Sequence, residues 1–560
     1  MITQSLLPGV LLFILIIGAA LTTPIAYFLL WLYRRAVLKG MKVTAGRTDT
    51  AAPLPAVATS SQPLTITQLA HSLPISSLVG ATPRVRSVRA SMQQVTLAYT
   101  LAGLTCAVLL ASAQLTSSKL EFLPIRLLLL AACYAWPLVL TLSLLAALGW
   151  RDQVAFAGVY FIFLIALSIG EILLSPNLTP IQLVLLWLIT NGPATLLMAT
   201  FLSRRIRAVG PLVFTFMLAS VAGSDFAALA IGSSDTTVRL VARFAAIFRL
   251  ADFAIIPLIM LVGCALLGLV GWLLLRWLGR RYRDKWMSDQ ALLLDALWLG
   301  FASWHSVAQL TIGWHWILNG FFAFVAYKLV LWVAFGWFVR PAAMTTHSPT
   351  LLLLRVFALG VRSQRLFDAL AKSWLRAGPI TLIAGPDLVT AIVEPHEFLD
   401  FIGGQLPRQF VRDAADLDQR IAQMDTRPDP DGRYRVNEFF CRADTWQMTM
   451  RRLAATTDSV LMDLRSFAPS NQGCLYELGQ LLINVPLARI ILLVDNTTDL
   501  AFLEETLHSL WRYVPDSGFN RMLPAPTIRL FRVHSATGAE VRVLLQLLLD
   551  QPSLQPALHH

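Results

Sequence analysis

The stretch Val460-Leu-Met-Asp-Leu-Arg-Ser-Phe-Ala-Pro-Ser-Asn-Gln-Gly-Cys-Leu-Tyr-Glu-Leu-Gly479 decides the fold of the last third of the chain. An apolar run ends at Asp463, a polar loop follows, and a helical pattern then carries Glu477 near its start. Carboxylates at a strand end and on the following helix commonly line the ligand crevice of a parallel α/β sheet. We therefore expect the chemistry of this protein to lie in this segment.

The sequence around this stretch alternates short apolar runs with helical patterns. Continuous apolar runs such as Ile490-Ile-Leu-Leu-Val494 suit strands that are covered on both faces. Repeated strand–helix alternation predicts an α/β domain over residues 379–550 with a doubly wound, mostly parallel five-stranded sheet, followed by a tail at 551–560. The predicted strands are 380–384, 438–441, 459–463, 490–495 and 528–533. The predicted helices are 394–423, which is broken, 444–456, 473–485, 499–513 and 537–549.

The composition of the whole chain indicates a polytopic membrane protein. Of its 560 residues 56% are hydrophobic and only 14% are charged, which is typical of several membrane spans joined to a soluble part. The net charge of +12 is concentrated at the ends of apolar runs, as in Arg280-Arg281-Tyr-Arg283. Because no basic, aromatic-interleaved motif occurs, we expect no nucleic-acid partner and assign the basic loops to the cytoplasmic side of a bilayer.

Apolar runs of about 20 residues predict nine helical spans. They are 6–33, 95–113, 123–150, 154–174, 181–202, 209–231, 253–275, 291–312 and 316–339. The first span and its basic flank occupy residues 1–43, a flexible cytoplasmic linker occupies 44–92, and the bundle occupies 93–340. Basic loops place the N-terminus outside and the C-terminal domain in the cytoplasm of a cell bounded by this inner (plasma) membrane.

Three segments leave alternatives open. The run 291–312 contains Asp295 and His305, so it either spans the membrane or lies at its surface or re-enters it. The run 236–251 has the pattern of an interfacial amphipathic helix, although its arginines then lie outside. Residues 341–378 form a connector with a basic amphipathic helical pattern over 351–375. That face either attracts anionic headgroups or packs on the domain that follows.

Polar residues within apolar runs are functional candidates by default. The candidates are Glu171, Asn191, Asp225, Asp295 and Lys328. Lys328 is a partner for Asp295 or Asp225, whereas Glu171 near the end of its span either has a role or simply reaches the headgroups. The five cysteines do not have metal-ligand spacing, and we predict neither a metal site nor a resident cofactor.

The carboxyl ends of the predicted strands name the candidate ligand-binding residues, because ligands of doubly wound sheets bind there. No G-x-G-x-x-G or Walker-type loop occurs, which argues against ordinary dehydrogenase and nucleotide-triphosphatase functions. Arg442 and Arg465 are candidates for a bidentate phosphate contact, or for a surface ion pair. The full set of candidates is Gly385, Asp387, Arg442, Asp444, Trp446, Asp463, Arg465, Ser466, Asn471 and Glu477.

Leu461-Met-Asp-Leu-Arg465 followed by Asn471-Gln-Gly-Cys-Leu-Tyr-Glu-Leu-Gly479 resembles a segment shared by Toll/interleukin-1-receptor-like and nucleoside deoxyribosyltransferase-like domains. The resemblance is specific over about twenty residues. It implies a flavodoxin-like sheet, self-association into a homo-oligomer, and a nucleotide such as NAD or a nucleoside as ligand or substrate. It also implies that Glu477 acts at the anomeric carbon of an N-glycosidic bond, with Asp463 and Asn471 lining the sugar pocket.

Two functions follow as hypotheses. The first is a membrane-anchored, nucleotide-recognising signalling or defence protein that cleaves an N-glycosidic bond through Glu477, since a carboxylate stabilises an oxocarbenium-like state and a helix N-terminus favours its ionised form. The second is a channel or transporter-like protein with a non-catalytic cytoplasmic regulatory or assembly domain. A plainer role for the same groups is structural, with Asn471 as a helix cap and Glu477 paired with Arg465.

Overall fold

The computed structural model describes residues 2–42, 62–69, 82–119, 121–146, 150–174, 179–199, 206, 209–232, 235–248, 252–309, 312–339, 348–355, 361–384, 393, 395–534 and 538–551. The chain divides into two compact units. The first, termed the helical unit, comprises Met1–Leu32, Gln94–Val339 and Val393–Ile402. The second, termed the sheet unit, comprises Tyr33–Gln93, Arg340–Ile392 and Gly403–His560.

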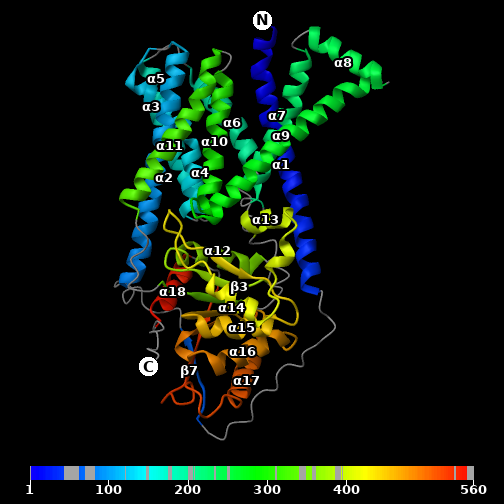
Figure 1. The fold of residues 1–560 in the computed structure, drawn as a ribbon. Helices are drawn as coiled ribbons and strands as arrows, with labels where there is room; N and C mark the ends of the chain where they lie inside the picture. Colours follow the sequence, from blue (N-terminus) through cyan, green and yellow to red (C-terminus); the bar gives the residue numbers. More distant parts are fainter. Residues whose placement is uncertain are drawn as a thin grey trace. The chain divides into compact units, whose positions relative to one another are not determined.

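The helical unit is built from long apolar helices (Figure 1). Eight of the described helices are long and apolar enough to cross a membrane, and the pair α3 and α4 passes the same test only when taken together. This is compatible with a multi-pass membrane protein, although the nine separate spans that we predicted are not matched as such. The helices are α1 (Ile2–Lys42), α2 (Pro83–Ser117), α3 (Pro124–Tyr134), α4 (Trp136–Ala146), α5 (Trp150–Leu174), α6 (Pro180–Ala199), α7 (Gly210–Gly232), α8 (Asp235–Phe248), α9 (Asp252–Arg283), α10 (Asp289–Gln309), the short η3 (Trp314–Ile317), α11 (Leu318–Trp337) and α13 (Pro395–Ile402).

The predicted span 123–150 is broken where α3 meets α4 at an angle of 45°. Pro137 has no N–H to donate to the carbonyl of Cys133, so a straight helix would leave that oxygen without its usual bond. Asn191 of α6 satisfies it, because its Nδ2 donates to the Cys133 carbonyl at 3.1 Å. Tyr160 of α5 donates in the same way to the carbonyl of Ala132 at 3.0 Å. The break is therefore stabilised by polar side chains from two neighbouring helices.

Helix α10 is the most buried of the long apolar helices of the helical unit within the described residues. Of the residues in its apolar window 67% are buried, the largest share among the candidate spans of the described chain. Its polar side chains have partners: Asp295 pairs with Lys328 of α11 at 2.7 Å, and the Trp298 indole donates to Thr141 Oγ1 at 3.1 Å. Of the two residues that cast doubt on this span, Asp295 pairs through Oδ2 with Lys328, and the buried His305 ring packs edge-on against Tyr134 with centroids 4.5 Å apart.

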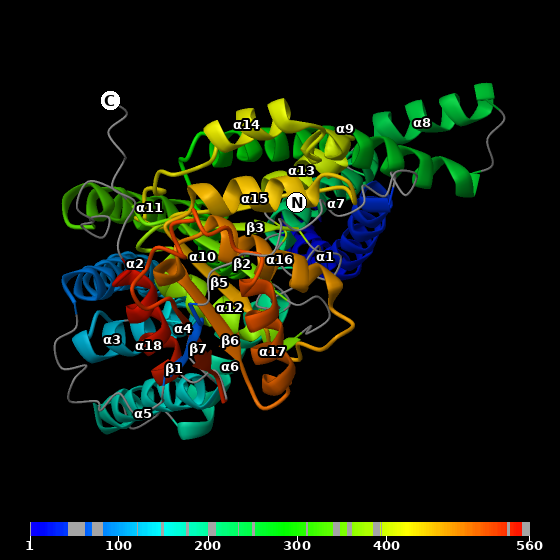
Figure 2. The ribbon, with the colours of Figure 1, turned by 90° about the horizontal axis from the view of Figure 1, so that it is seen from below.

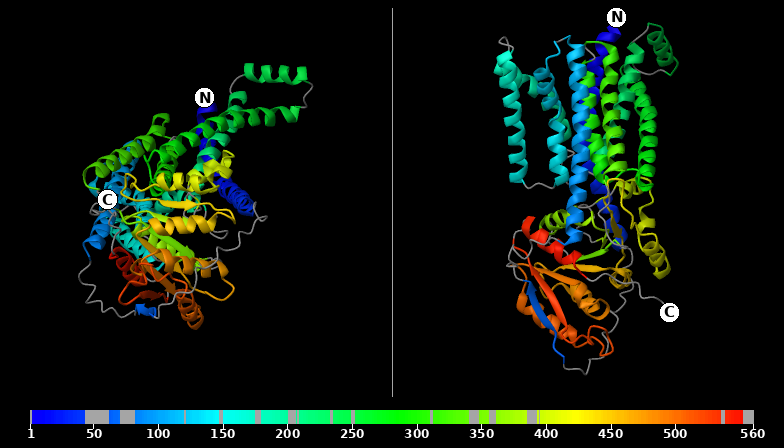
Figure 3. Two further views of the ribbon diagram at one scale, coloured as in Figure 1. Left: turned by 60° about the horizontal axis from the view of Figure 1, so that its bottom comes forward. Right: turned by 90° about the vertical axis from the view of Figure 1, so that its left-hand side faces the viewer.

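Helices α7 and α9 pack with their backbones in close contact. A Cβ atom on Gly223 would overlap the carbonyl oxygen of Gly263, and one on Gly263 would overlap that of Gly223. Small residues at such positions let helices approach closely in membranes. Helix α8, which joins them, projects away from the other helices of its unit (Figure 3). Its sequence is strongly amphipathic, as we predicted for the run 236–251.

The sheet unit contains a seven-stranded, fully parallel sheet in the order β4–β3–β2–β5–β6–β7–β1. The topology reverses between β2 and β5, because β3 and β4 extend outward from β2 while β6 and β7 extend outward from β5. This order is that of dinucleotide-binding sheets with one added edge strand. A flavodoxin-like sheet, which the resemblance implies, has the strand order 2-1-3-4-5, with only one strand on the outer side of its first strand. Here two strands, β3 and β4, lie on that side of β2, so this expectation is wrong. The strands are β1 (Thr65–Leu69), β2 (Leu351–Arg355), β3 (Ile380–Ile383), β4 (Val436–Phe439), β5 (Ser459–Asp463), β6 (Ile490–Val494) and β7 (Thr527–Arg532).

Five of these strands were predicted and two were not. Leu351–Arg355 is β2, at the centre of the sheet, rather than the start of a connector helix, which is limited to α12 (Val361–Trp374). Four consecutive leucines have neither the period-two pattern of a strand nor the periodicity of an amphipathic helix. Our predicted helix therefore included them together with the amphipathic segment that follows. Thr65–Leu69 within the predicted linker is edge strand β1, paired in parallel with β7. Its burial does not alternate regularly, since only Ile66 and Leu69 are partly covered, and the surrounding sequence is rich in Pro and Ser.

Helices cover both faces of the sheet (Figure 2). One core joins the strands to α15 (Trp446–Thr456), α16 (Gln472–Asn484) and α17 (Leu500–Trp511), with Leu417 of α14 (Ala414–Ala422). The other joins them to α12 and α18 (Gly538–Leu549), with Val88 from the first turns of α2. The short helices η4 (Leu406–Gln409) and η5 (Leu487–Arg489) complete the unit.

The central pairing of β2 with β5 is pinned by a reciprocal side-chain contact just before the two strands. Asp458 Oδ2 accepts from both the backbone N–H and the hydroxyl of Thr350 at 2.9 Å, and the Thr350 hydroxyl accepts from the Asp458 N–H at 3.0 Å. This fixes the register in which Leu351 lies beside Ser459 and Arg355 beside Asp463.

Replacing Gly223 with Leu should force α7 and α9 apart, at a cost of about 1–3 kcal/mol typical of overpacking. We expect the full-length protein in detergent to lose its monodisperse elution peak at a lower temperature than the parent protein. Gly158→Leu on α5 is the matched control, because no atom lies within 4 Å of a Cβ at that position. Equal heat resistance of the two variants would contradict the close α7–α9 packing.

Candidate functional site

A cavity of about 320 Å³ lies at the carboxyl ends of β2, β3 and β4, beside the point where the sheet topology reverses. Ligands of doubly wound sheets bind in this crevice. Most of its wall is apolar, and the ionisable groups on it are Lys42, Cys441, Arg442 and Glu477. The lining residues are Met41, Lys42, Leu353, Leu354, Leu382, Ile383, Ala384, Cys441, Arg442, Ala443, Trp446, Gly473 and Glu477.

Glu477 is a buried carboxyl group on the wall of this cavity. It lies on the inward face of α16 with Cys474, Leu478 and Leu481, and only 4% of its surface is exposed. Its Oε2 atom has no hydrogen-bond partner within the described residues. Burial raises the pKa of Glu477 from its ordinary 4.5 to about 8, so the group is mainly protonated at neutral pH. The expectation that the helix N-terminus keeps it ionised is wrong, because desolvation dominates.

Asp463, the other predicted catalytic carboxylate, lies in a different environment. It ends β5 and is held by Arg465, whose Nη2 lies 2.6 Å from Oδ2 and whose Nε lies 2.8 Å from Oδ1. Both side chains are buried, and neither lines the cavity. Burial, reinforced by Glu477 and Asp463, raises the pKa of Cys474 to about 12. The two carboxyl groups therefore both act on this thiol, but only Glu477 faces the open space.

Ser466 and Asn471 shape the loop between β5 and α16. Ser466 adopts a left-handed backbone conformation with φ of 58°, and its hydroxyl lies 2.8 Å from that of Thr497 in the loop after β6. Asn471 Oδ1 accepts from the backbone N–H of Ala468 at 2.9 Å. Its side chain closes this turn and makes no capping bond to α16. Both residues thus hold the loop, and neither is on the cavity wall.

Arg442 and Trp446, from the segment after β4, are on the cavity wall. The half-buried Arg442 side chain makes no ion pair with any described residue, whereas its backbone N–H donates to Thr445 Oγ1 at 3.0 Å. The Trp446 ring packs edge-on against Tyr476 with centroids 5.4 Å apart. Asp444, between them, is exposed and lies off the wall. The predicted residues Gly385 and Asp387 lie outside the described part of the chain.

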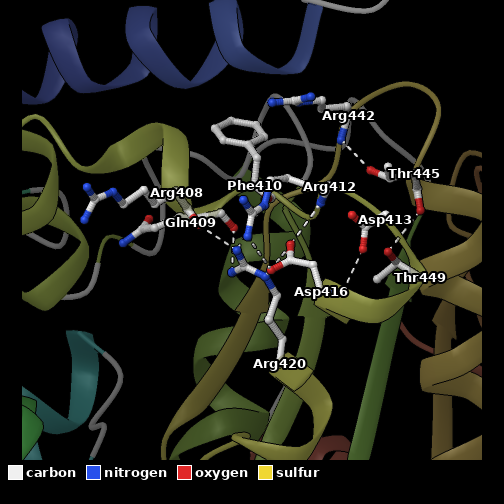
Figure 4. Close-up of polar contacts among 10 residues, drawn as sticks. All are labelled: Arg408, Gln409, Phe410, Arg412, Asp413, Asp416, Arg420, Arg442, Thr445 and Thr449. Carbon is white, nitrogen blue, oxygen red and sulfur yellow. Dashed lines mark hydrogen bonds and ion pairs between the residues drawn. The ribbon is translucent and has the colours of Figure 1, made fainter. Parts of the chain in front are cut away.

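A polar framework fixes the chain beside Arg442 (Figure 4). Arg420 donates to the carbonyls of Arg408, Gln409 and Phe410 and pairs with Asp416 at 3.1 Å. These bonds hold Phe410 in a parallel bridge to Phe440, immediately after β4. The Arg442 guanidinium points away from the Arg420–Asp416 pair in Figure 4. The framework therefore positions the backbone of Arg442 while leaving its charge for the cavity.

Several wall residues were not predicted. Met41 and Lys42 end α1, and Gly40 lies so close to the Phe410 ring that any side chain there would overlap it. Leu353 and Leu354 were missed because β2 was missed. Lys42 was visible in the sequence as one of the basic residues after the first apolar run. We interpreted those residues as marking the cytoplasmic side of the membrane and not as part of a ligand site.

The intramembrane polar residues are dispersed through the helical unit. Glu171 is buried and pairs with Arg126 at 2.8 Å. Asn191 supports the break before α4, and Asp295 pairs with Lys328. Asp225 is the remaining member, and its Oδ2 has no hydrogen-bond partner among described residues.

No group of three or more metal-ligating side chains occurs among the residues that the structure describes. No protein-family description, curated protein or solved structure matches this chain.

Glu477→Gln should stabilise the protein near neutral pH. The folded state holds the Glu477 proton more tightly than the unfolded chain does. The stability that this protonation contributes is therefore complete below pH 4.5 and is lost as the pH rises to about 8. Removing the titration should raise stability at pH 7 by roughly 1–3 kcal/mol. Thermal unfolding of the full-length protein from pH 5 to 9 would measure it.

Glu505→Gln is the control for this measurement, since Glu505 is exposed on α17. We expect that variant to follow the pH profile of the parent protein. A Glu477→Gln profile that falls with pH as steeply as the parent would show that Glu477 is ionised in the folded protein.

Proposed function

We propose that the sheet unit binds a nucleotide in the cavity at the β2–β5 reversal, and that the protein is a membrane-anchored nucleotide-recognising sensor. One observation carries this proposal: the buried Glu477 carboxyl faces the same cavity as the Arg442 guanidinium. Among the described residues, Glu477 Oε2 has no hydrogen-bond partner and Arg442 makes no ion pair. A few convergent polar groups in an otherwise apolar crevice are typical of small-molecule sites.

Three polar or aromatic wall groups suit two parts of a nucleotide, the base and the phosphate. A protonated Glu477 presents one donor and one acceptor, which suits the edge of a nucleobase. Trp446 offers an aromatic surface for the base, and Arg442 offers a fork of N–H donors for a phosphate. The cavity volume of about 320 Å³ is at the small end of the roughly 300–1,000 Å³ range of ligand pockets. We therefore favour a mononucleotide over a complete dinucleotide.

Recognition is better supported than N-glycosidic cleavage. An oxocarbenium-like state needs an ionised carboxylate beside the sugar. At neutral pH Glu477 is mainly protonated, and Asp463 is engaged by Arg465 away from the cavity wall. A cleavage activity through Glu477 would have to increase as the pH rises through about 8, when the carboxylate forms.

We further propose nine crossings of an inner (plasma) membrane, with the N-terminus outside and the sheet unit in the cytoplasm. Edge strand β1 comes from the loop between α1 and α2 and pairs with β7, so that loop and the C-terminal part of the chain share one side. An even number of crossings must then separate the start of α2 from the end of α11. Seven helices there pass the span test alone, and the bent pair α3–α4 supplies the eighth. The basic ends of α1, α2 and α9 then all face the cytoplasm.

Titration of full-length protein in nanodiscs with AMP and adenosine tests nucleotide recognition. We expect Arg442→Ala to weaken AMP binding by about tenfold or more while leaving adenosine binding unchanged, because only AMP carries the phosphate. Exposed Arg512→Ala is the charge-matched control. Failure of the parent protein to bind either compound, or AMP affinity unchanged by Arg442→Ala, would refute the proposed mode.

The pH dependence of adenosine binding tests the role of Glu477. We expect affinity for the parent protein to fall as the pH rises from 7 to 9, because ionisation removes the donor. Glu477→Gln keeps a donor and an acceptor, so its affinity should vary little over this range, whereas Glu477→Leu should bind weakly throughout. Analysis of the same samples for free nucleobase separates binding from cleavage.

Labelling with a membrane-impermeant maleimide tests the topology. Asp152→Cys at the start of α5 should be protected in intact cells and labelled after permeabilisation, and Thr237→Cys on α8 should be labelled without it. The parent protein, which has five cysteines, gives the background. Immediate labelling at position 152 would mean that α3–α4 re-enters the membrane without crossing it.

A further inference from the structure

A second cavity lies inside the helical unit, between α1, α7 and α9, with a volume of about 820 Å³. Aromatic and aliphatic side chains form most of its wall, among them Phe13 of α1, Phe216 of α7 and Trp272 of α9. Phe13 and Leu269 on this wall are also more than half exposed, at 52% and 57%. Exposed apolar side chains on a membrane-spanning helix face acyl chains, so the cavity opens toward the interior of the bilayer.

Asp225 is the only ionisable carboxyl group among the residues that line this cavity. Its Oδ2 is buried and has no hydrogen-bond partner within the described chain. The other two candidate acids of the described spans differ, because Glu171 pairs with Arg126 and Asp295 pairs with Lys328. An ionisable side chain inside a membrane is costly unless a counter-charge or a functional partner compensates it. The missing compensation at Asp225 points to a ligand.

The walls around Asp225 are held in place by close packing. Gly223 and Gly263 bring the backbones of α7 and α9 together, which places Asp225 two residues beyond the contact. On the α1 side, a Cβ at Gly18 would lie 2.9 Å from a methyl group of Leu218, so α1 also lies close to α7. The cavity is thus bounded on three sides by helices that cannot easily collapse into it.

We propose that this cavity binds a lipophilic organic cation, with Asp225 as the counter-charge. The apolar walls suit the hydrocarbon body of such a ligand, and aromatic rings attract an ammonium or phosphonium centre through cation–π interactions. An inorganic divalent cation is disfavoured, because calcium takes six to eight oxygen ligands and the polar groups here are Asp225 and the hydroxyls of Ser220 and Ser224. The opening toward acyl chains lets a membrane-soluble cation enter from the bilayer.

This proposal is independent of nucleotide recognition in the sheet unit, since none of the residues involved is shared with that cavity. The test uses full-length protein in nanodiscs of zwitterionic lipid, so that lipid headgroups do not attract the probe. Tetraphenylphosphonium is titrated and its binding is followed by calorimetry. We expect saturable binding to the parent protein and a loss of at least about tenfold in affinity for Asp225→Asn.

Two further variants separate charge from folding. Asp225→Glu keeps the carboxylate and should retain most of the affinity, whereas Asp152→Asn, on the exposed first turn of α5, should bind as the parent does. Elution of each variant as a single species confirms that it is folded. No saturable binding to the parent, or equal affinities for the parent and Asp225→Asn, would overturn the proposal. Equal affinities would show that the Asp225 carboxylate is not the counter-charge of the bound cation.

Discussion

The parallel pairing of β2 with β5 is the constraint on which the candidate nucleotide site depends. Thr350 and Asp458 exchange hydrogen bonds just before the two strands and fix their register. The strands that follow β2 extend the sheet in one direction and those that follow β5 extend it in the other. A crevice opens where neighbouring connections diverge. The cavity of about 320 Å³ is walled by the ends of β2 and β3, the segment after β4, the end of α1 and the start of α16.

The two buried carboxyl groups of this region, Asp463 and Glu477, have different electrostatic environments. Asp463 has a two-point ion pair with Arg465, so its charge is compensated although it is buried. Glu477 has no such partner, and burial therefore favours its neutral form. Geometry thus distributes the roles: the Asp463–Arg465 pair stabilises the loop, while Glu477 remains available as a hydrogen-bonding group. Glycoside hydrolysis needs two carboxyl groups that both flank the bond to be broken, whereas only Glu477 of this pair lines the cavity.

The sequence predicted those parts of the fold that have strong local patterns. The alternation of apolar strands and amphipathic helices after residue 379 identified β3 to β7, and the long apolar runs identified the membrane helices. It failed for β2, where four leucines have no periodicity, and for β1, where a short edge strand is separated from its partner β7 by most of the chain.

Among the site residues, Glu477, Arg442 and Trp446 were predictable because they follow strand ends. The environment that changes the protonation of Glu477 depends on long-range packing, and no local pattern reveals it. The contribution of Lys42 was hidden for the same reason, since it comes from a helix more than three hundred residues earlier in the chain.

Helix α1 contributes residues to the walls of both cavities. Phe13, Ile17 and Leu21 of this helix line the cavity of the helical unit, while Met41 and Lys42 at its other end line the cavity of the sheet unit. Ligands in the two cavities would therefore both contact one continuous α-helix. If a ligand in one cavity changes the affinity of the other cavity for its ligand, thermodynamic linkage requires the second ligand to change the affinity for the first by the same factor. A single helix thereby belongs to both compact units of the chain.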